Sequence, residues 1–279
     1  MTDSLIDALI DTLKLLPYLY VTFLIIELME ERLTARSREL ISRAERFGPL
    51  VGSLVGLLPQ CGFSVMATNL FITRIISLGT LMAIYLATSD EMLPIMISNR
   101  AALSQILPLL LIKLVTGLLA GTLINLIIPH QKTQQHDYTL CEDDDCECEE
   151  HGPFLAALKH TVNIALFILV ITALLNVTVF LHGESFLEKI LLVNEPVSPL
   201  LATIIGLIPN CGSSVILTQL YLSGAISLPM AASGLLANSG VALLVLFRNN
   251  HHRRQENLLI IGLLSAISSL VGWIIMLIQ

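Results

Sequence analysis

Gly56-Leu57-Leu58-Pro59-Gln60-Cys61-Gly62-Phe63-Ser64-Val65 is an apolar run that is broken in its middle, and it occurs twice in this chain. The second copy lies 150 residues later, as Gly206-Leu207-Ile208-Pro209-Asn210-Cys211-Gly212-Ser213-Ser214-Val215. The similarity continues without a gap over residues 56–97 and 206–247. We infer that the chain is a duplication, in which each copy carries a Pro-polar-Cys-Gly break.

Composition identifies the class of protein. Hydrophobic residues make up 54% of the chain and charged residues only 13%, and the mean hydropathy is +0.80. These values are typical of a polytopic membrane protein and exclude an ordinary soluble core of this length. The formal net charge of −7 comes from one acidic segment between His130 and His151, so it says nothing about the rest of the surface.

Two apolar runs beside each break are too short to cross a bilayer, which requires roughly 20 helical residues. A re-entrant helical hairpin is therefore predicted in each copy. Its two helices are residues 49–58 and 63–73 in the first copy and residues 199–208 and 213–223 in the second. Residues 75–97 and 226–247 predict a discontinuous helix, interrupted at 88–91 and 238–240. Further spans are expected at 5–28, 101–128, 154–181 and 258–277.

These segments predict an all-α polytopic fold made of two repeats, each with three crossings (one discontinuous) and one re-entrant hairpin. Residues 1–129 form the first repeat, 130–152 an acidic Cys/His-rich cytoplasmic loop, and 153–279 the second repeat. Since an odd number of crossings reverses the second copy, the repeats are expected to be inverted. Arginines at 32–46, Arg74 and the basic cluster 248–254 favour the cytoplasmic side, which puts both termini outside.

The paired breaks are the predicted substrate site. Transporters use unwound backbone near the midplane to hold substrate, and cysteine sulfur suits soft metals and trivalent arsenic. A packed kink without ligand, with cysteine as a small apolar filler, is the alternative. The predicted substrate-binding residues are Pro59, Gln60, Cys61, Gly62, Ser64, Thr68, Asn69, Pro209, Asn210, Cys211, Gly212, Ser214, Thr218, Gln219, Asn238 and Ser239.

Three charged residues lie within apolar runs: Asp90, Glu91 and Lys113. Charges at such positions are costly in a bilayer and usually serve a function with a partner. An acid paired with Lys113 would suit proton coupling. Alternatively, Asp90 and Glu91 only begin a half-helix near the outer surface, where acids suit the helix dipole.

The acidic loop contains three of the five cysteines, Cys141, Cys146 and Cys148, followed by His151. Three thiols and a histidine can close a tetrahedral zinc site or a trisulfur arsenite site, although the spacing is not a standard zinc pattern. A disordered acidic tether is the alternative. We expect metal capture at the cytoplasmic mouth.

The two Pro-[Gln/Asn]-Cys-Gly-x-Ser motifs and the central Cys146-Glu147-Cys148-Glu149-Glu150-His151-Gly152 segment resemble a bacterial membrane family described as ten-span heavy-metal exporters, which is related in name to arsenic-efflux permeases. Some of its members are called manganese transporters. The resemblance covers nearly the whole chain. Ten spans agree with the predicted segments, since six crossings and four half-helices make ten.

The sequence therefore predicts a secondary transporter that exports a soft metal or metalloid across the bacterial inner membrane, with proton coupling. No nucleotide-binding G-x-x-x-x-G-K-[ST] motif occurs, and no enzymatic activity, cofactor or nucleic-acid partner is expected. The lipid bilayer and the metal ion are the expected partners, and a homodimer is left open. Transport of manganese or of a small organic anion, and a membrane-embedded metal sensor or enzyme, are the alternatives.

Overall fold

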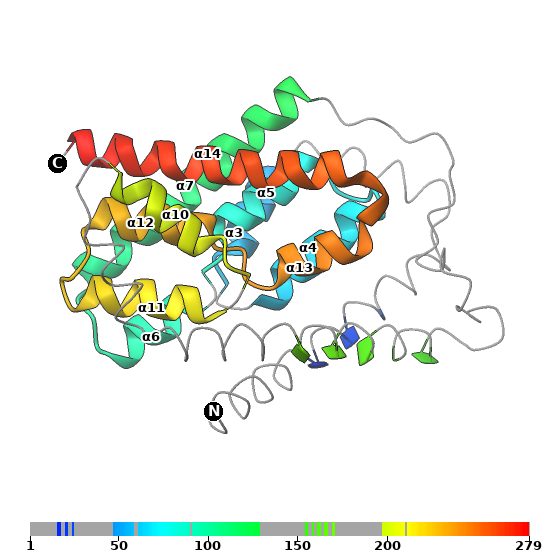
Figure 1. The fold of residues 1–279 in the computed structure, drawn as a ribbon, viewed down its shortest axis with the longest axis horizontal. Coiled ribbons are helices and arrows are strands. Elements are labelled where there is room, and N and C mark those ends of the chain that lie inside the picture. Colours follow the sequence, from blue (N-terminus) through cyan, green and yellow to red (C-terminus); the bar gives the residue numbers. More distant parts are fainter. Residues whose placement is uncertain are drawn as a thin grey trace.

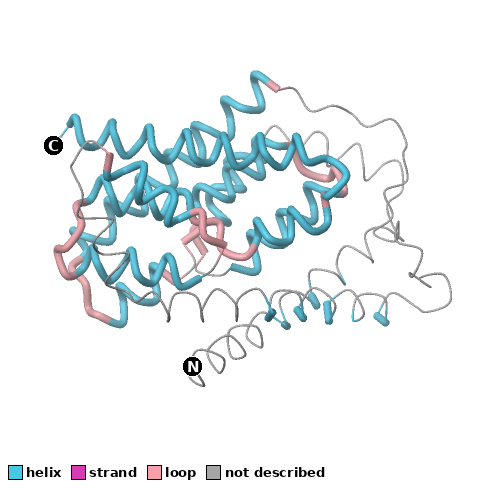
Figure 2. The backbone as a smooth tube through the Cα atoms, in the orientation of Figure 1, coloured by secondary structure: helices cyan, strands magenta, loops and turns pink. Residues whose placement is uncertain are grey.

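The computed structural model describes residues 47–58, 61–89, 91–128, 197–209 and 211–278, with single helical positions between residues 16 and 24 and between 154 and 170. Every regular element in these ranges is a helix, and none is a strand (Figures 1 and 2). The predicted all-helical class is therefore confirmed for the described residues.

The two halves contain corresponding α-helices in the same order, and the second half has one additional short helix. The first half has α3 (Gly48–Gly56), α4 (Cys61–Ile72), α5 (Leu78–Ala87), α6 (Met92–Ser98) and α7 (Leu103–Ile127). The second half has α10 (Ser198–Gly206), α11 (Cys211–Leu222), α12 (Leu228–Ala237), α13 (Ala242–Asn249), the short 3-10 helix η2 (His251–Arg253) and α14 (Arg254–Ile278). The duplication seen in the sequence is thus also a duplication of helix order.

Both predicted interruptions are present. Helix α5 ends at Ala87 and α6 begins at Met92, while α12 ends at Ala237 and α13 begins at Ala242. Short helices also flank the Pro-x-Cys-Gly turns, since α3 and α10 have nine residues each and α4 and α11 have twelve. At 1.5 Å per residue, a nine-residue helix is about 14 Å long, roughly half of a bilayer's hydrocarbon core.

Small residues bring α3 into close contact with α5. A side chain at Gly56 would place its Cβ 2.8 Å from the Ile84 carbonyl oxygen, and one at Gly121 of α7 would place it 2.6 Å from the Gly79 carbonyl. Absence of a Cβ therefore allows these helix backbones to approach, as expected for small residues at four-residue spacing in membrane helices. In the second half, Gly206 has the same relation to Gly234 of α12.

The long helices α7 and α14 have one buried and one exposed apolar face. On α7, Lys113, Gly117 and Gly121 are buried, whereas leucines and valine at every fourth position are exposed: Leu103, Leu107, Leu111, Val115, Leu119 and Leu123. Four helical segments of the described residues are long and apolar enough to cross a membrane: Leu78–Ser98, Leu103–Ile127, Leu228–Asn249 and His251–Ile278. The exposed apolar faces are suited to contact with lipid.

The two halves exchange helices. Helix α4 of the first half packs against α13 of the second, and α11 of the second packs against α6 of the first; Figure 1 shows both pairs side by side. The apolar core is therefore shared, so that one cluster joins Leu81, Tyr85 and Val65 to Leu236 and Val245. Any site at the broken helices is built by both halves.

Candidate functional site at the helix breaks

The two motif cysteines open helices at corresponding places. Cys61 is the first residue of α4 and Cys211 the first residue of α11. Gly62 and Gly212 follow in the same first turns, and Pro209 lies in the turn before α11. A helix N-terminus carries partial positive charge, which favours a thiolate over a thiol. Pro59, Gln60 and Asn210 lie outside the described residues.

Polar residues one to two turns further along these helices point into the protein. Ser64, Thr68, Asn69, Ser214 and Thr218 are all buried. The hydroxyls of Thr68 and Thr218 each donate to the backbone carbonyl four residues earlier, at 2.7 Å. The predicted residue Gln219 differs from its counterpart Asn69, because it is exposed.

Asn69 and Thr68 connect α4 to its surroundings. Thr68 Oγ1 lies 2.6 Å from the hydroxyl of Tyr85 on α5. The side-chain oxygen of Asn69 accepts a hydrogen bond from Asn249 of α13 at 3.3 Å, whereas its Nδ2 has no partner among the described residues. Thr68 therefore helps to fix α4 within the first half, and Asn69 faces the second half.

The second break, between α12 and α13, holds two buried polar residues. Asn238 and Ser239 are 2% and 1% exposed. The Asn238 side-chain oxygen accepts from the Gly240 backbone N–H at 2.8 Å, and Gly240 has a φ of +59°, a conformation that glycine adopts without strain. In Figure 1 the α12–α13 connection, in orange, crosses the middle of the bundle.

Lys113 links this break to the first half. It is 1% exposed on α7, and its ammonium donates to the Leu235 carbonyl, near the C-terminal end of α12. A cation is favourable at a helix C-terminus because the last carbonyls lack intrahelical partners. Lys113, which the sequence predicted as a functional charge, therefore lies at a helix break, but at the α12–α13 break of the second half.

At the first break, between α5 and α6, the Thr88 and Ser89 hydroxyls form hydrogen bonds with nearby backbone carbonyls. Thr88 Oγ1 donates to the Ile84 carbonyl at 2.7 Å, and Ser89 Oγ donates to the Ala87 carbonyl at 3.2 Å. Glu91 is half-buried and immediately precedes α6. Asp90 lies outside the described residues, as do the loop residues Cys141, Cys146, Cys148 and His151. In the described ranges, no three His, Cys, Asp or Glu side chains gather as a metal-binding set.

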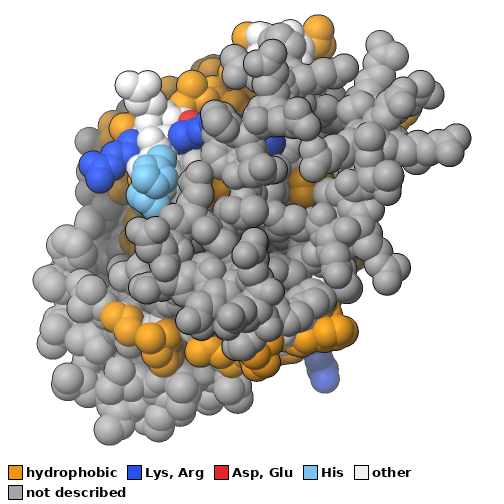
Figure 3. Space-filling model, turned by 90° about the vertical axis from the view of Figure 1, so that its right-hand side faces the viewer, with side chains coloured by type: hydrophobic (Ala, Val, Ile, Leu, Met, Phe, Trp, Pro, Cys, Tyr) orange, Lys and Arg blue, Asp and Glu red, His pale blue; other side chains and the backbone are white. Residues whose placement is uncertain are grey.

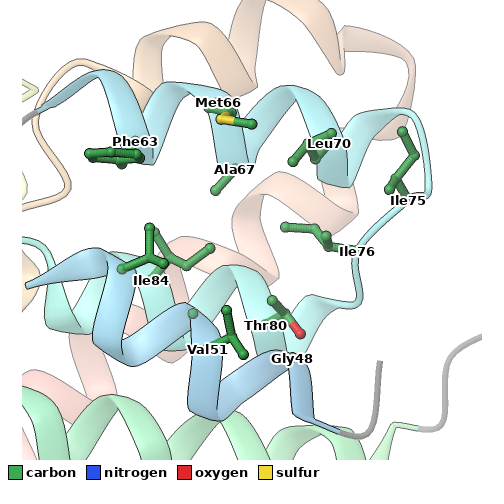
Figure 4. A pocket seen from close by; sticks show the side chains of 12 residues that line it. Gly48, Val51, Phe63, Met66, Ala67, Leu70, Ile75, Ile76, Thr80 and Ile84 are labelled. Atoms are coloured by element: carbon green, nitrogen blue, oxygen red, sulfur yellow. The ribbon is translucent and has the colours of Figure 1, made fainter. Parts of the chain in front are cut away.

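A cavity of about 370 Å³ lies between α3, α4 and α5 (Figure 4). Its lining is apolar apart from Thr80: Val51, Val55, Phe63, Met66, Ala67, Leu70, Ile75, Ile76 and Ile84, with Gly48 and Gly52 on the α3 side. Such a lining offers little to a metal ion, so this cavity is separate in character from the polar break.

Sequence reasoning used Arg74 only as a topology marker and missed its partner. The Arg74 guanidinium donates two hydrogen bonds to the Glu256 carboxylate of α14, at 2.7 and 2.8 Å. Asn250 donates a third to the same carboxylate at 3.1 Å. Arg74 and the basic cluster 248–254 thus lie at one end of the bundle. Figure 3 shows histidine side chains, in pale blue, beside side chains of Lys or Arg, in blue. No spacing in the sequence pairs residues 182 positions apart.

Comparison with known proteins agrees with this architecture. The sequence matches a family described as "Putative, 10TM heavy-metal exporter", over residues 1–186 and again over residues 130–271. No curated protein and no solved structure matches the chain. The protein is therefore a multi-pass membrane protein, and since the two matches together extend from residue 1 to residue 271, the chain belongs to the family so described.

Proposed function

We propose that this protein is a secondary transporter that exports a soft metal or metalloid ion across the bacterial inner membrane, with proton coupling. The observation that carries the proposal is the exchange of half-length helices. Each half supplies a helix that begins at a motif cysteine, α4 at Cys61 and α11 at Cys211, and each of these packs against the broken helix of the other half. Two soft ligands are thereby offered at related places.

The architecture we propose has inverted repeats. The common helix order of the halves supports a two-fold relation, and the short lengths of α3 and α4 support a hairpin that enters and leaves on one side. The proposal also puts both termini outside and the acidic loop inside. Cysteine-accessibility labelling, in a background without native cysteines, should find positions 40 and 140 inside and position 190 outside. Positions 40 and 190 on one face would contradict inversion.

Substrate binding is assigned to the paired turns and the neighbouring breaks. Thiolates select soft metals and trivalent arsenic, and a helix N-terminus favours the thiolate form. Proton coupling is assigned to Glu91, Asp90 and Lys113. The burial of Lys113 at the α12 break supports this assignment, because buried ionisable groups within membrane spans are costly and commonly serve transport.

Serine substitution of the motif cysteines tests the proposal. Purified protein in liposomes should export arsenite or cadmium. Cys61→Ser and Cys211→Ser should each lower the rate about tenfold or more, since even the loss of a residue that only hydrogen-bonds to a metal ligand lowers affinity by about 10–100-fold. The double variant should be little worse than either single variant, because one shared site is already broken. Cys141→Ser, which removes a thiol outside the motifs, should leave export at saturating substrate unchanged.

Two outcomes would contradict this function. Additive losses in free energy from the two serine variants would indicate two independent sites. Full transport after alanine substitution at both Cys61 and Cys211 would favour the alternative carrier of a small organic anion, which needs the helix N-termini but no thiols.

A further inference from the structure

The second helix break leaves two buried polar groups unused. Asn238 Nδ2 and Ser239 Oγ have no hydrogen-bonding partner among the described residues, although both side chains are at least 98% buried. The orientation of the Asn238 amide is fixed, because its oxygen already accepts from the Gly240 N–H. The unused atom is therefore the nitrogen, which can only donate. Buried donors without partners are rare in native proteins and suggest a ligand.

The first break shows that interrupting a helix does not by itself leave buried polar side chains without partners. At the corresponding positions, Thr88 and Ser89 donate their hydroxyls to nearby backbone carbonyls. The duplicated sequence thus satisfies these two side chains at the break of the first half and leaves polar atoms of their counterparts unused at the break of the second. The difference singles out Asn238 and Ser239.

The surroundings of the second break favour acceptor atoms and negative charge. The Lys113 ammonium is held at the Leu235 carbonyl, three residues before Asn238. Helix α13, which has eight residues, begins at Ala242 directly after the break, so its positive N-terminal end also lies here. A bare metal cation needs several lone pairs, and of the unused side-chain atoms at this break only the Ser239 hydroxyl offers them, whereas the amide nitrogen and the ammonium group do not.

We propose that Asn238 and Ser239 form an oxygen-binding subsite, so that the protein transports an oxo or hydroxo form of a metalloid in preference to a bare metal cation. This inference rests on the proposed export function and names its substrate class. The motif cysteines supply soft ligands, and the break supplies hydrogen-bond donors to the oxygen atoms of the substrate.

Two thiol-seeking probes separate these substrate classes: arsenite, which carries oxygen atoms, and cadmium ion, which does not. Asn238→Asp keeps the oxygen that accepts from Gly240 and replaces the unused donor by an acceptor. In titration calorimetry on purified protein, it should raise the arsenite Kd at least about tenfold and leave the cadmium Kd equal or lower, since the hydrogen bond donated to a substrate oxygen is lost. Ser239→Ala should weaken arsenite alone, by about three- to tenfold.

Ser89→Ala is the matched control, because its hydroxyl already donates to Ala87, and the arsenite Kd should stay unchanged. The subsite is refuted if both probes bind through the cysteines while Asn238→Asp and Ser239→Ala leave the arsenite Kd unchanged. If wild-type protein binds neither probe, or binding survives serine at both Cys61 and Cys211, the proposed export function itself fails. Size-exclusion profiles establish whether each variant is folded. If Asn238→Asp does not fold, the arsenite Kd of Ser239→Ala, the smaller change, decides whether the subsite exists.

Discussion

The ion pair between Arg74 and Glu256 joins the end of α4 in the first half to the start of α14 in the second. The two side chains are 18% and 25% exposed and share two hydrogen bonds of 2.7 and 2.8 Å. Arg74 also has a φ of +58°, where the corresponding residue of the second half, Gly224, has +75°. We predict that removal of this pair destabilises the protein by more than an ordinary surface ion pair would.

The magnitude follows from two opposing terms. Arg74→Ala removes two charge-assisted hydrogen bonds, which partial solvent exposure weakens, so we expect a loss of about 2 kcal/mol. Arg74→Gly loses the same pair but relieves the left-handed conformation, which costs a non-glycine residue roughly 1 kcal/mol. The glycine variant should therefore lose only about 1 kcal/mol.

Arg100 provides a matched control. It also has a positive φ, of +52°, at the end of a helix, but its exposed guanidinium has no ion pair or hydrogen bond among the described residues. Arg100→Ala should be nearly neutral, and Arg100→Gly should stabilise by up to about 1 kcal/mol. The difference between the two glycine variants gives the contribution of the Arg74 side chain, which combines the ion pair with a cation–π contact to Phe71, and the double-mutant cycle with Glu256 separates the ion pair from that contact.

Thermal unfolding in one detergent measures these changes. At about 2–4 °C per kcal/mol for a chain of this size, Arg74→Ala should lower the Tm by about 4–8 °C. A double-mutant cycle with Glu256→Gln should show a coupling of about 1–2 kcal/mol. Equal Tm values for Arg74→Ala and Arg100→Ala, or a coupling of less than about 0.5 kcal/mol, would refute the reasoning.

Three further experiments test the packing and the loop. Gly206→Ala should destabilise the protein by about 3 kcal/mol, because its Cβ would overlap a backbone carbonyl of α12. Gly262→Ala has open space around it and should stabilise the protein by about 0.5–1 kcal/mol. Thermal unfolding of the two variants checks both values. Tyr85→Phe should cost about 1 kcal/mol by removing the contact with Thr68, and an unchanged Tm would contradict it. A peptide of residues 130–152 should bind zinc, cadmium or arsenite with release of protons, which calorimetry in two buffers detects; binding without proton release would exclude thiolate ligands.

The sequence alone determined the duplication, the helix class and the places where helices break. Helix α5 ends at Ala87 and α12 at Ala237, directly before the predicted interruptions. Helices α4 and α11 begin two residues earlier than predicted, at Cys61 and Cys211. These features could be predicted because proline, glycine and short polar residues act on the backbone within one helical turn, so their effect does not depend on the rest of the fold.

Only the tertiary structure decided which side chains meet. The contacts of Lys113 with Leu235, of Arg74 with Glu256 and of Asn69 with Asn249 join residues 122, 182 and 180 positions apart. Helices that are apolar on every side carry little periodic signal for the direction of a polar residue. The packing of α4 against α13 fixes one of these directions, because it brings Asn69 to Asn249 of the opposite half.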